Sequence, residues 1–179
     1  KELYLRTCRS SPSSRSWLGA GAAAIAGGQL QEAEEALTEA NILDNTNPSV
    51  WGNLTLVCLK SVPPRHEEAE QALRQAFKFN LSSVPLLEQL GSIYAEQGYY
   101  SAAEGCLRRA AGTEAGASDR GQKLLADVLA AQNQYEFALR EYRDLLSRET
   151  ISAALRTAAE SGEQDMLTAL GNGAAPLRK

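Results

Sequence analysis

One alanine position recurs along the chain at an almost constant interval. Its four copies are spaced 36, 34 and 35 residues apart: Ala33, Ala69, Ala103 and Ala138. A second column, seven residues further on, holds Ala40, Ala76, Ala110 and Leu145. Periods of this length are typical of arrays in which each small structural unit packs on the next one. The recurrence therefore predicts a stack of four repeats.

The residues inside each repeat favour helices. Hydrophobic residues make up 44% of the sequence but aromatic residues only 6%, so the core must be built mainly from alanine and leucine. Both residues have high helix propensity, and alternating runs of Val, Ile and Thr, which would indicate strands, are absent. The sequence predicts an all-α fold in which each repeat is a pair of antiparallel helices.

Close crossing of two helices requires small side chains at the contact and larger ones three or four positions away on the same face. The candidate structural positions that follow this rule are Trp17, Gly21, Ala33, Trp51, Ala69, Leu90, Gly91, Tyr94, Ala103, Ala138 and Tyr142.

This pattern resembles the tetratricopeptide repeat (TPR), W-x2-L-G-x2-Y followed by A-x3-F-x2-A. The third copy matches best, with Leu90, Gly91, Tyr94, Gly98, Tyr100, Ala103, Leu107 and Ala110. The resemblance implies a right-handed superhelical solenoid of four helix-turn-helix repeats, at about residues 14–47, 48–83, 84–118 and 119–147. The second repeat carries two extra residues in its turn, within SVPPRHE at 61–67, where we expect His66 to lie in a solvated loop.

The two ends depart from the repeat. We expect residues 1–13 to form an N-terminal tail and residues 172–179 a C-terminal tail. Residues 148–171 are predicted to form two capping helices, the first stopped by Gly162 and the second by the Gly171–Asn172–Gly173 run.

The residues that carry chemistry are sparse. His66 is the sole histidine, and the three cysteines, at positions 8, 58 and 106, lie far apart without a CxxC pair. We therefore predict no enzyme activity, no metal site and no cofactor. A net charge of −4 argues against nucleic-acid binding, and no apolar run is long enough to span a bilayer.

The TPR resemblance also implies a protein-binding concave face, formed by the first helix of each repeat. We expect partner contacts from Leu18, Ile25, Asn53, Leu56, Leu59, Lys60, Arg120 and Lys123. On this hypothesis Leu56→Glu weakens binding and leaves the fold largely intact. The alternative is that the N-terminal tail or a preceding segment covers these apolar residues.

A further stretch, Gln31–Lys60, resembles the C-terminal repeat region of a family of axonemal proteins of cilia and flagella. The resemblance rests on Glu32–Leu37, Glu39–Asn41, Asn45, Asn47, Val50–Trp51, Leu54 and Leu56–Lys60. It implies a non-catalytic scaffold in the axoneme, associated with outer dynein arms and with regulation of motility. Alternatives are a cytosolic adaptor in intraflagellar transport or trafficking, a regulatory array attached to a catalytic domain elsewhere, and self-association of the array.

Overall fold

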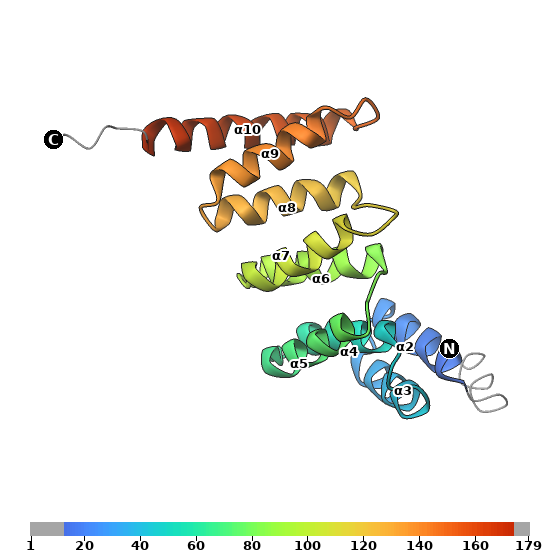
Figure 1. The fold of residues 1–179 in the computed structure, drawn as a ribbon. Helices are drawn as coiled ribbons and strands as arrows, with labels where there is room; N and C mark the ends of the chain where they lie inside the picture. The colour runs from blue at the N-terminus through green and yellow to red at the C-terminus, as the bar shows by residue number, and fades with distance from the viewer. Residues whose placement is uncertain (1–12, 174–179) are drawn as a thin grey trace. The chain divides into compact units, whose positions relative to one another are not determined.

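The computed structural model describes residues 13–173, and this part of the chain contains helices and no strand (Figure 1). The helices are α2 Ser14–Ala26, α3 Leu30–Leu43, α4 Pro48–Lys60, α5 His66–Lys78, α6 Val84–Glu96, α7 Tyr100–Ala111, α8 Asp119–Ala131, α9 Tyr135–Leu146 and α10 Ala153–Gly173. The predicted all-α class is confirmed. Cys8 and most of the two predicted tails lie outside the described residues.

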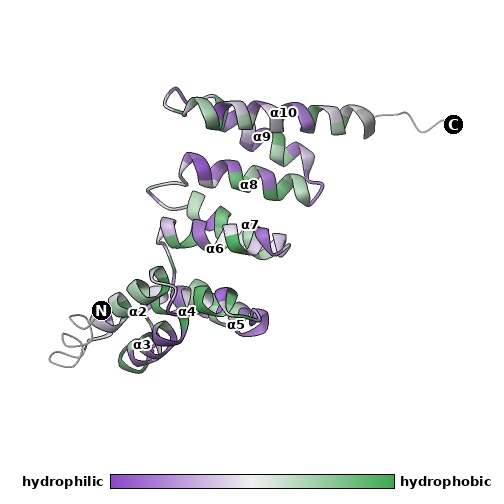
Figure 2. Ribbon diagram, turned by 180° about the vertical axis from the view of Figure 1, so that it is seen from behind, coloured by the Kyte–Doolittle hydropathy of each residue, from purple (hydrophilic) through white to green (hydrophobic). Residues whose placement is uncertain are grey.

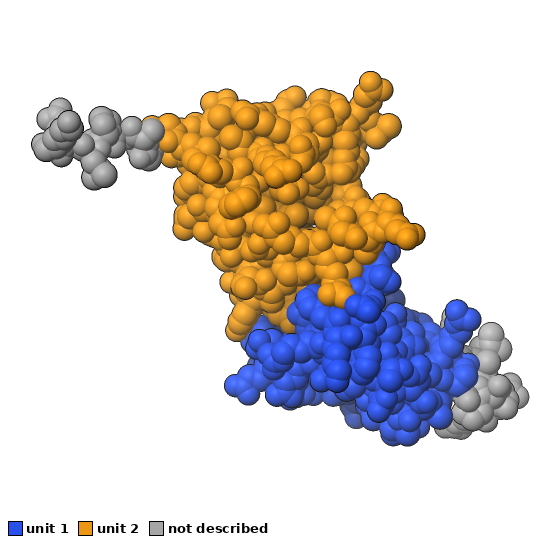
Figure 3. Space-filling model, in the orientation of Figure 1, with its two compact units in different colours: residues 1–86 blue, residues 87–179 orange. Residues whose placement is uncertain are grey.

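The chain divides into two compact units, with the boundary between Leu86 and Leu87 in the first turn of α6 (Figure 3). In the first unit, α2 packs on α3 and α4 on α5, and α4 also contacts α2 and α3. In the second unit, α7 packs on α8, α8 on α9, and α10 on both α9 and α8. Each helix carries both hydrophobic and hydrophilic residues (Figure 2), as amphipathic helices of a stacked array do.

Small residues lie where the paired helices meet. Ala33, Ala69, Ala103 and Ala138 have no exposed surface. At Gly21 and Gly91 a Cβ atom would lie 2.6 and 2.7 Å from the Cγ atoms of Leu37 and Leu107. Glycine is therefore required at both positions for the two helices of the pair to approach this closely.

The large residues of the pattern fill the space beside these contacts. Leu90, Tyr94 and Tyr142 are buried. Trp17 is partly buried against Ala20 and Ala36 in the first pair. Trp51 is half-buried, and its indole Nε1 donates a hydrogen bond to the Asn45 carbonyl at 2.8 Å, which ties α4 to the loop before it.

Three of the turns inside the helical pairs are short and share one geometry. In the first, Gly28 has a positive φ of 72° and the Gln29 amide donates to the Ala24 carbonyl at 2.9 Å. Gly98 and Asn133 occupy the same place in two later turns. A left-handed residue closing the helix in this way is the usual C-terminal stop.

The turn between α4 and α5 keeps this closing bond but is two residues longer. The Arg65 amide donates to the Cys58 carbonyl at 3.0 Å, as Gln29 does to Ala24. The extra residues extend into solvent, and Val62 is 97% exposed. The sequence predicts that His66 lies in this loop. In the structure His66 is instead the half-buried first residue of α5.

The end of the array differs from the prediction, because α10 is one helix from Ala153 to Gly173 and does not stop at Gly162. Gly162 lies against the ring of Tyr142, where a Cβ atom would come within 2.4 Å of Cζ. The glycine therefore serves close packing of α10 on α9 instead of ending a helix. Elsewhere on α10, Ala159 and Met166 are buried, whereas Glu160 and Gln164 are exposed together with Leu167.

Two glycines of α10 are expected to respond in opposite ways to substitution by alanine. Gly171→Ala should raise the free energy of unfolding by up to about 1 kcal/mol, because nothing lies within 4 Å of the added Cβ and alanine favours helix. Gly162→Ala should lower the free energy, because the Tyr142 ring must move. Thermal unfolding of both variants measures this contrast, and equal stabilisation by both would contradict the packing of Gly162 on Tyr142.

Within residues 13–173, no helix is long and apolar enough to cross a membrane.

Candidate protein-binding surfaces

The apolar part of the predicted partner face is buried in the protein itself. Leu56 and Leu59 are 2% and 1% exposed, and Ile25 is also buried. The reason is the position of α4, which contacts α2, α3 and α5, so that residues on most of its circumference are enclosed. The prediction that these three side chains receive a partner is wrong. Because Leu56 is buried, Leu56→Glu is expected to disturb the fold.

The remaining predicted residues of the first unit lie nearer to solvent. Leu18 is half-buried on α2 and Lys60 is exposed at the end of α4. The amide of Asn53 is half-buried and donates to the Ser49 carbonyl of its own helix at 2.8 Å. Arg15, Ala22 and Ala26 are exposed on α2. The residues of this face that a partner could contact are therefore mainly small or basic, and they do not form a strip of leucines.

In the second unit, the two predicted basic residues differ. Arg120 is exposed in the first turn of α8. The Lys123 ammonium instead bonds both carboxylate oxygens of Asp127, at 2.9 and 2.7 Å, and the Tyr142 hydroxyl donates to the same carboxylate at 2.6 Å. Burial and the neighbouring Asp127 raise the pKa of Tyr142 well above its usual value. The bond from Tyr142 to Asp127 thus joins α9 to α8, Lys123 is paired within α8, and Arg120 is the more accessible cation.

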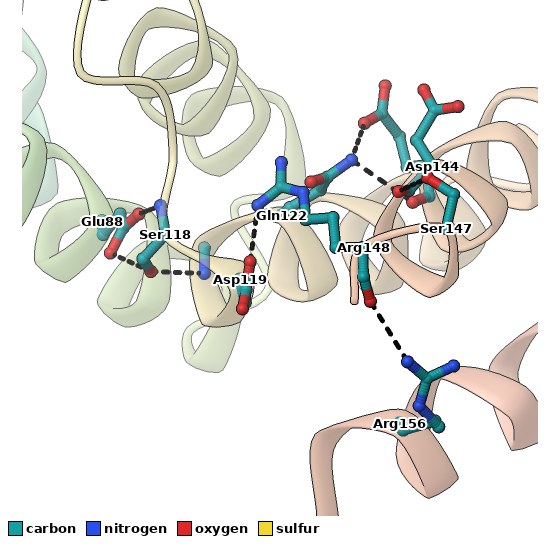
Figure 4. A network of polar contacts seen from close by, with 10 residues as sticks. Glu88, Ser118, Asp119, Gln122, Asp144, Ser147, Arg148 and Arg156 are labelled. Atoms are coloured by element: carbon teal, nitrogen blue, oxygen red, sulfur yellow. Dashed lines mark hydrogen bonds and ion pairs between the residues drawn. The ribbon is translucent and has the colours of Figure 1, made fainter. Parts of the chain in front are cut away.

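Side chains join successive helices of the second unit in a polar network that the sequence did not indicate (Figure 4). The Glu88 carboxylate accepts bonds from the Ser118 amide at 2.7 Å and from its hydroxyl at 2.8 Å. The same hydroxyl caps α8 by accepting the Gly121 amide at 3.0 Å. A Cβ atom at Gly121 would collide with Glu88. Glu88 therefore holds the start of α8 and is not available as a partner contact of α6.

The network continues to the last two helices. Arg148, after α9, forms an ion pair with Asp119 at the start of α8. Arg156 of α10 donates to the Leu146 carbonyl at 3.3 Å and to the Arg148 carbonyl at 3.1 Å, and Figure 4 shows the second of these bonds. A cation placed at the C-terminal end of a helix satisfies carbonyls that the helix leaves unpaired. These contacts fix α10 on the array.

The first unit has its own ion-pair cluster around the long turn. The Arg65 guanidinium donates to both carboxylate oxygens of Glu34 at 2.9 and 2.8 Å, and to Glu68 at 3.0 Å. Paired bonds of this kind orient both groups. They anchor the base of the α4–α5 turn on α3.

Glu104 gives the second unit a pH-dependent contact. Burial acts to raise the pKa of the Glu104 carboxyl, but hydrogen bonds from Arg108 at 2.7 Å and Gln132 at 2.8 Å outweigh it, so the pKa lies below its usual 4.5. A lowered folded-state pKa adds stability above pH 4.5, and this stability is lost as the pH falls through the folded value.

Glu104→Gln should therefore lower the free energy of unfolding by about 1 kcal/mol near pH 7, and this difference should shrink below pH 4.5. Urea unfolding at a series of pH values measures it. Glu136→Gln, at an exposed carboxylate on α9, is the matched control and should leave the pH profile of the parent chain unchanged. A Glu104→Gln difference that does not vary with pH would contradict the role of the ionised carboxylate.

The described part of the chain brings together no group of three or more His, Cys, Asp or Glu that could hold a metal ion. Cys58 and Cys106 are buried free thiols, and burial raises the pKa of Cys106 to about 12.

Comparison with known proteins gives a family match over nearly the whole chain. Residues 1–168 match the family model described as the C-terminal domain of cilia and flagella-associated protein 70. Curated proteins named cilia- and flagella-associated protein 70, from Macaca fascicularis and Homo sapiens, are each 42% identical over 99 residues, or 55% of this chain. The matched part is 10% and 9% of these two relatives, so this chain spans only a small fraction of their length.

Solved structures show the fold. A thermophilic TPR protein of Thermus thermophilus has a TM-score of 0.63 at 19% identity, covering 90% of this chain and 87% of that one. YrrB, described as a TPR protein with an unusual peptide-binding site, has a TM-score of 0.65 at 14% identity, covering 92% and 89%. The TPR fold expected from the sequence is confirmed.

Proposed function

Because the chain belongs to the family of the C-terminal TPR domain of cilia- and flagella-associated protein 70, we propose that it is a non-catalytic protein-binding scaffold of the ciliary or flagellar axoneme. Its partners on this proposal are outer dynein arm or docking components, and its role is in the regulation of motility. The observation that carries the proposal is the family match over residues 1–168.

The exposed residues of the first helices support a revised version of the partner face. Leu18, Lys60 and Arg120 remain accessible, whereas the leucines of α4 do not. Basic side chains at helix ends, beside small residues, suit an acidic or polar segment of a partner better than the apolar strip expected from the sequence. Each unit has an accessible cation on this face, Lys60 in the first and Arg120 in the second.

Capture from solubilised axonemes tests this function. The 179-residue chain serves as bait, and bound proteins are identified by mass spectrometry. We expect dynein-arm or docking components with the parent chain, and at least fivefold less with Lys60→Glu or Arg120→Glu. Glu35→Lys, an equally large charge change at an exposed position of α3, is the matched control and should capture as the parent does.

The possible outcomes separate the surface from the assignment. Equal capture of these components by all variants would reject the Lys60 and Arg120 face but keep the axonemal function. Failure of the parent chain to enrich any dynein-arm or docking component would reject the axonemal function of this region.

A further inference from the structure

Three aromatic side chains of the second unit are exposed. Tyr99 is 46%, Tyr100 37% and Phe137 56% accessible, although most large apolar side chains of the described residues are buried. Tyr99 and Tyr100 lie where α7 begins, and Phe137 lies in the first turn of α9. Aromatic residues grouped at a surface are characteristic of protein contact sites, because they bury a large area with little loss of side-chain freedom.

These residues lie on one edge of the second unit. The α6–α7 and α8–α9 turns are on the same side of it in both Figure 1 and Figure 2. Gln132, at the end of α8, donates to Glu104 of α7 at 2.8 Å. Glu104 is four residues after Tyr100 and therefore on the same face of α7. We call this surface the turn edge and define it by Glu96, Tyr99, Tyr100, Glu136 and Phe137.

The backbone of the turn edge is held in place. The Tyr99 amide donates to the Tyr94 carbonyl at 2.8 Å, and the two rings meet edge to face with centroids 6.4 Å apart. In the second turn, the Tyr135 hydroxyl donates to Asn133 at 2.6 Å. A surface ordered before binding loses less entropy when a partner docks.

The charge of the turn edge indicates what it fits. Glu96 and Glu136 are exposed, and among residues 13–173 neither forms an ion pair; the Glu96 carboxylate accepts a bond from Ser92 at 3.0 Å. Arg140 follows one turn later on α9, further from the turn. Aromatic faces attract cations, and an arginine guanidinium both stacks on rings and pairs with carboxylates.

We propose that the turn edge binds an arginine-bearing amphipathic helix of a partner protein. Its apolar side chains would cover Phe137 and the tyrosine rings, and its guanidinium groups would pair with Glu96 and Glu136. The inference rests on the proposed function only in taking this TPR region to be protein-binding. It uses a separate surface, because Arg120 lies at the other end of α8, about 18 Å from Gln132 along the helix.

Two synthetic probes test the turn edge. One is an amphipathic helical peptide of leucine and arginine, and the other has glutamate in place of every arginine. We expect the Leu/Arg peptide to bind the 179-residue chain in fluorescence anisotropy, more weakly as salt increases, and the Leu/Glu peptide to show at least tenfold weaker binding. Equal binding of both peptides, or no binding of the Leu/Arg peptide up to millimolar concentration, would overturn the proposal.

Matched variants locate the binding. The double variant Tyr99→Ser, Phe137→Ser should bind the Leu/Arg peptide at least tenfold more weakly than the parent chain. The double variant Glu96→Gln, Glu136→Gln should reduce both the affinity for this peptide and the salt dependence of its binding. The control Ile42→Ser, Leu43→Ser also removes two exposed large apolar side chains, but from α3, and should bind as the parent does. All these positions are exposed, so helix content at the assay temperature should be unchanged in each variant. Tyr99→Ser also removes the edge-to-face contact with Tyr94, so the melting temperature of that double variant should fall slightly.

Further outcomes separate this proposal from others. Equal loss of binding in the turn-edge variant and in the α3 control would overturn it. Light scattering that shows the chain to be a dimer, disrupted by Tyr99→Ser and Phe137→Ser, would assign the edge to a second copy and reject a partner helix. Peptide binding without axonemal capture would leave the turn edge supported and reject the axonemal function, whereas the reverse result would reject the turn edge alone.

Discussion

Leu56→Glu is expected to unfold the first unit. The side chain is 2% exposed on α4, the helix that contacts three others. A carboxylate there must either be buried with its charge or take up a proton, and a pKa displaced by about three units corresponds to about 4 kcal/mol. Loss of the leucine packing adds to this. The free energy of unfolding of a small domain is only about 5–15 kcal/mol in total. The first unit of the variant should therefore be largely unfolded at about 37 °C.

Thiol labelling measures this effect unit by unit. Cys58 lies two residues after Leu56 and is buried in the first unit, whereas Cys106 is buried in the second. The variant should make Cys58 react with a maleimide at a rate approaching that in urea, while Cys106 stays protected. Leu56→Met, which conserves volume, should leave Cys58 protected. Protection of Cys58 in Leu56→Glu would contradict the burial of this helix.

Ala103→Trp is expected to have the largest effect in the second unit. Ala103 has no exposed surface, on the face of α7 that also buries Leu107 and Cys106. An indole cannot enter this contact unless α7 moves away from its neighbours, at a cost of about 3 kcal/mol. Stability should fall, and Cys106 should become reactive at lower urea concentration than in the parent chain.

The same substitution at an exposed site of the same helix provides the control. Ala111→Trp, at the exposed end of α7, should change the urea midpoint by little. The two variants share the new side chain and the helix, so they differ in burial. An equal midpoint for both would mean that Ala103 does not lie at a close helix contact.

The close helix contacts could be predicted from the sequence because they repeat. Four alanines at near-constant spacing identify the crossing point, and Gly21 and Gly91 share a repeat position where a Cβ would strike a leucine of the second helix. The period also predicts which positions of α4 point away from α5. It does not say what else covers them, and for that reason the sequence predicts partner contacts at Leu56 and Leu59, which are in fact buried.

Contacts between repeats had no sequence signal. Glu34 and Arg65 are 31 residues apart and Glu104 and Gln132 are 28 apart, and neither pair belongs to the repeat pattern. Gly162 shows the limit of a local rule. Glycine often ends a helix, yet here the Tyr142 ring takes the space that any side chain would need. The sequence does not indicate the aromatic turn edge. Phe137 and Tyr100 have residue types that also occur in the core, and only their exposure in the structure sets them apart.

The closing bond from the Arg65 amide to the Cys58 carbonyl makes the α4–α5 turn tolerant of length. Two residues have already been accommodated outside this bond without separating the helices it joins. The Arg65 guanidinium also pairs with Glu34 of α3. A residue inserted in the loop should therefore not displace the helices on either side. A short epitope or fluorescent label placed at Val62 would therefore report where the protein resides in a living cell, while the helices and the turn edge stay unmodified.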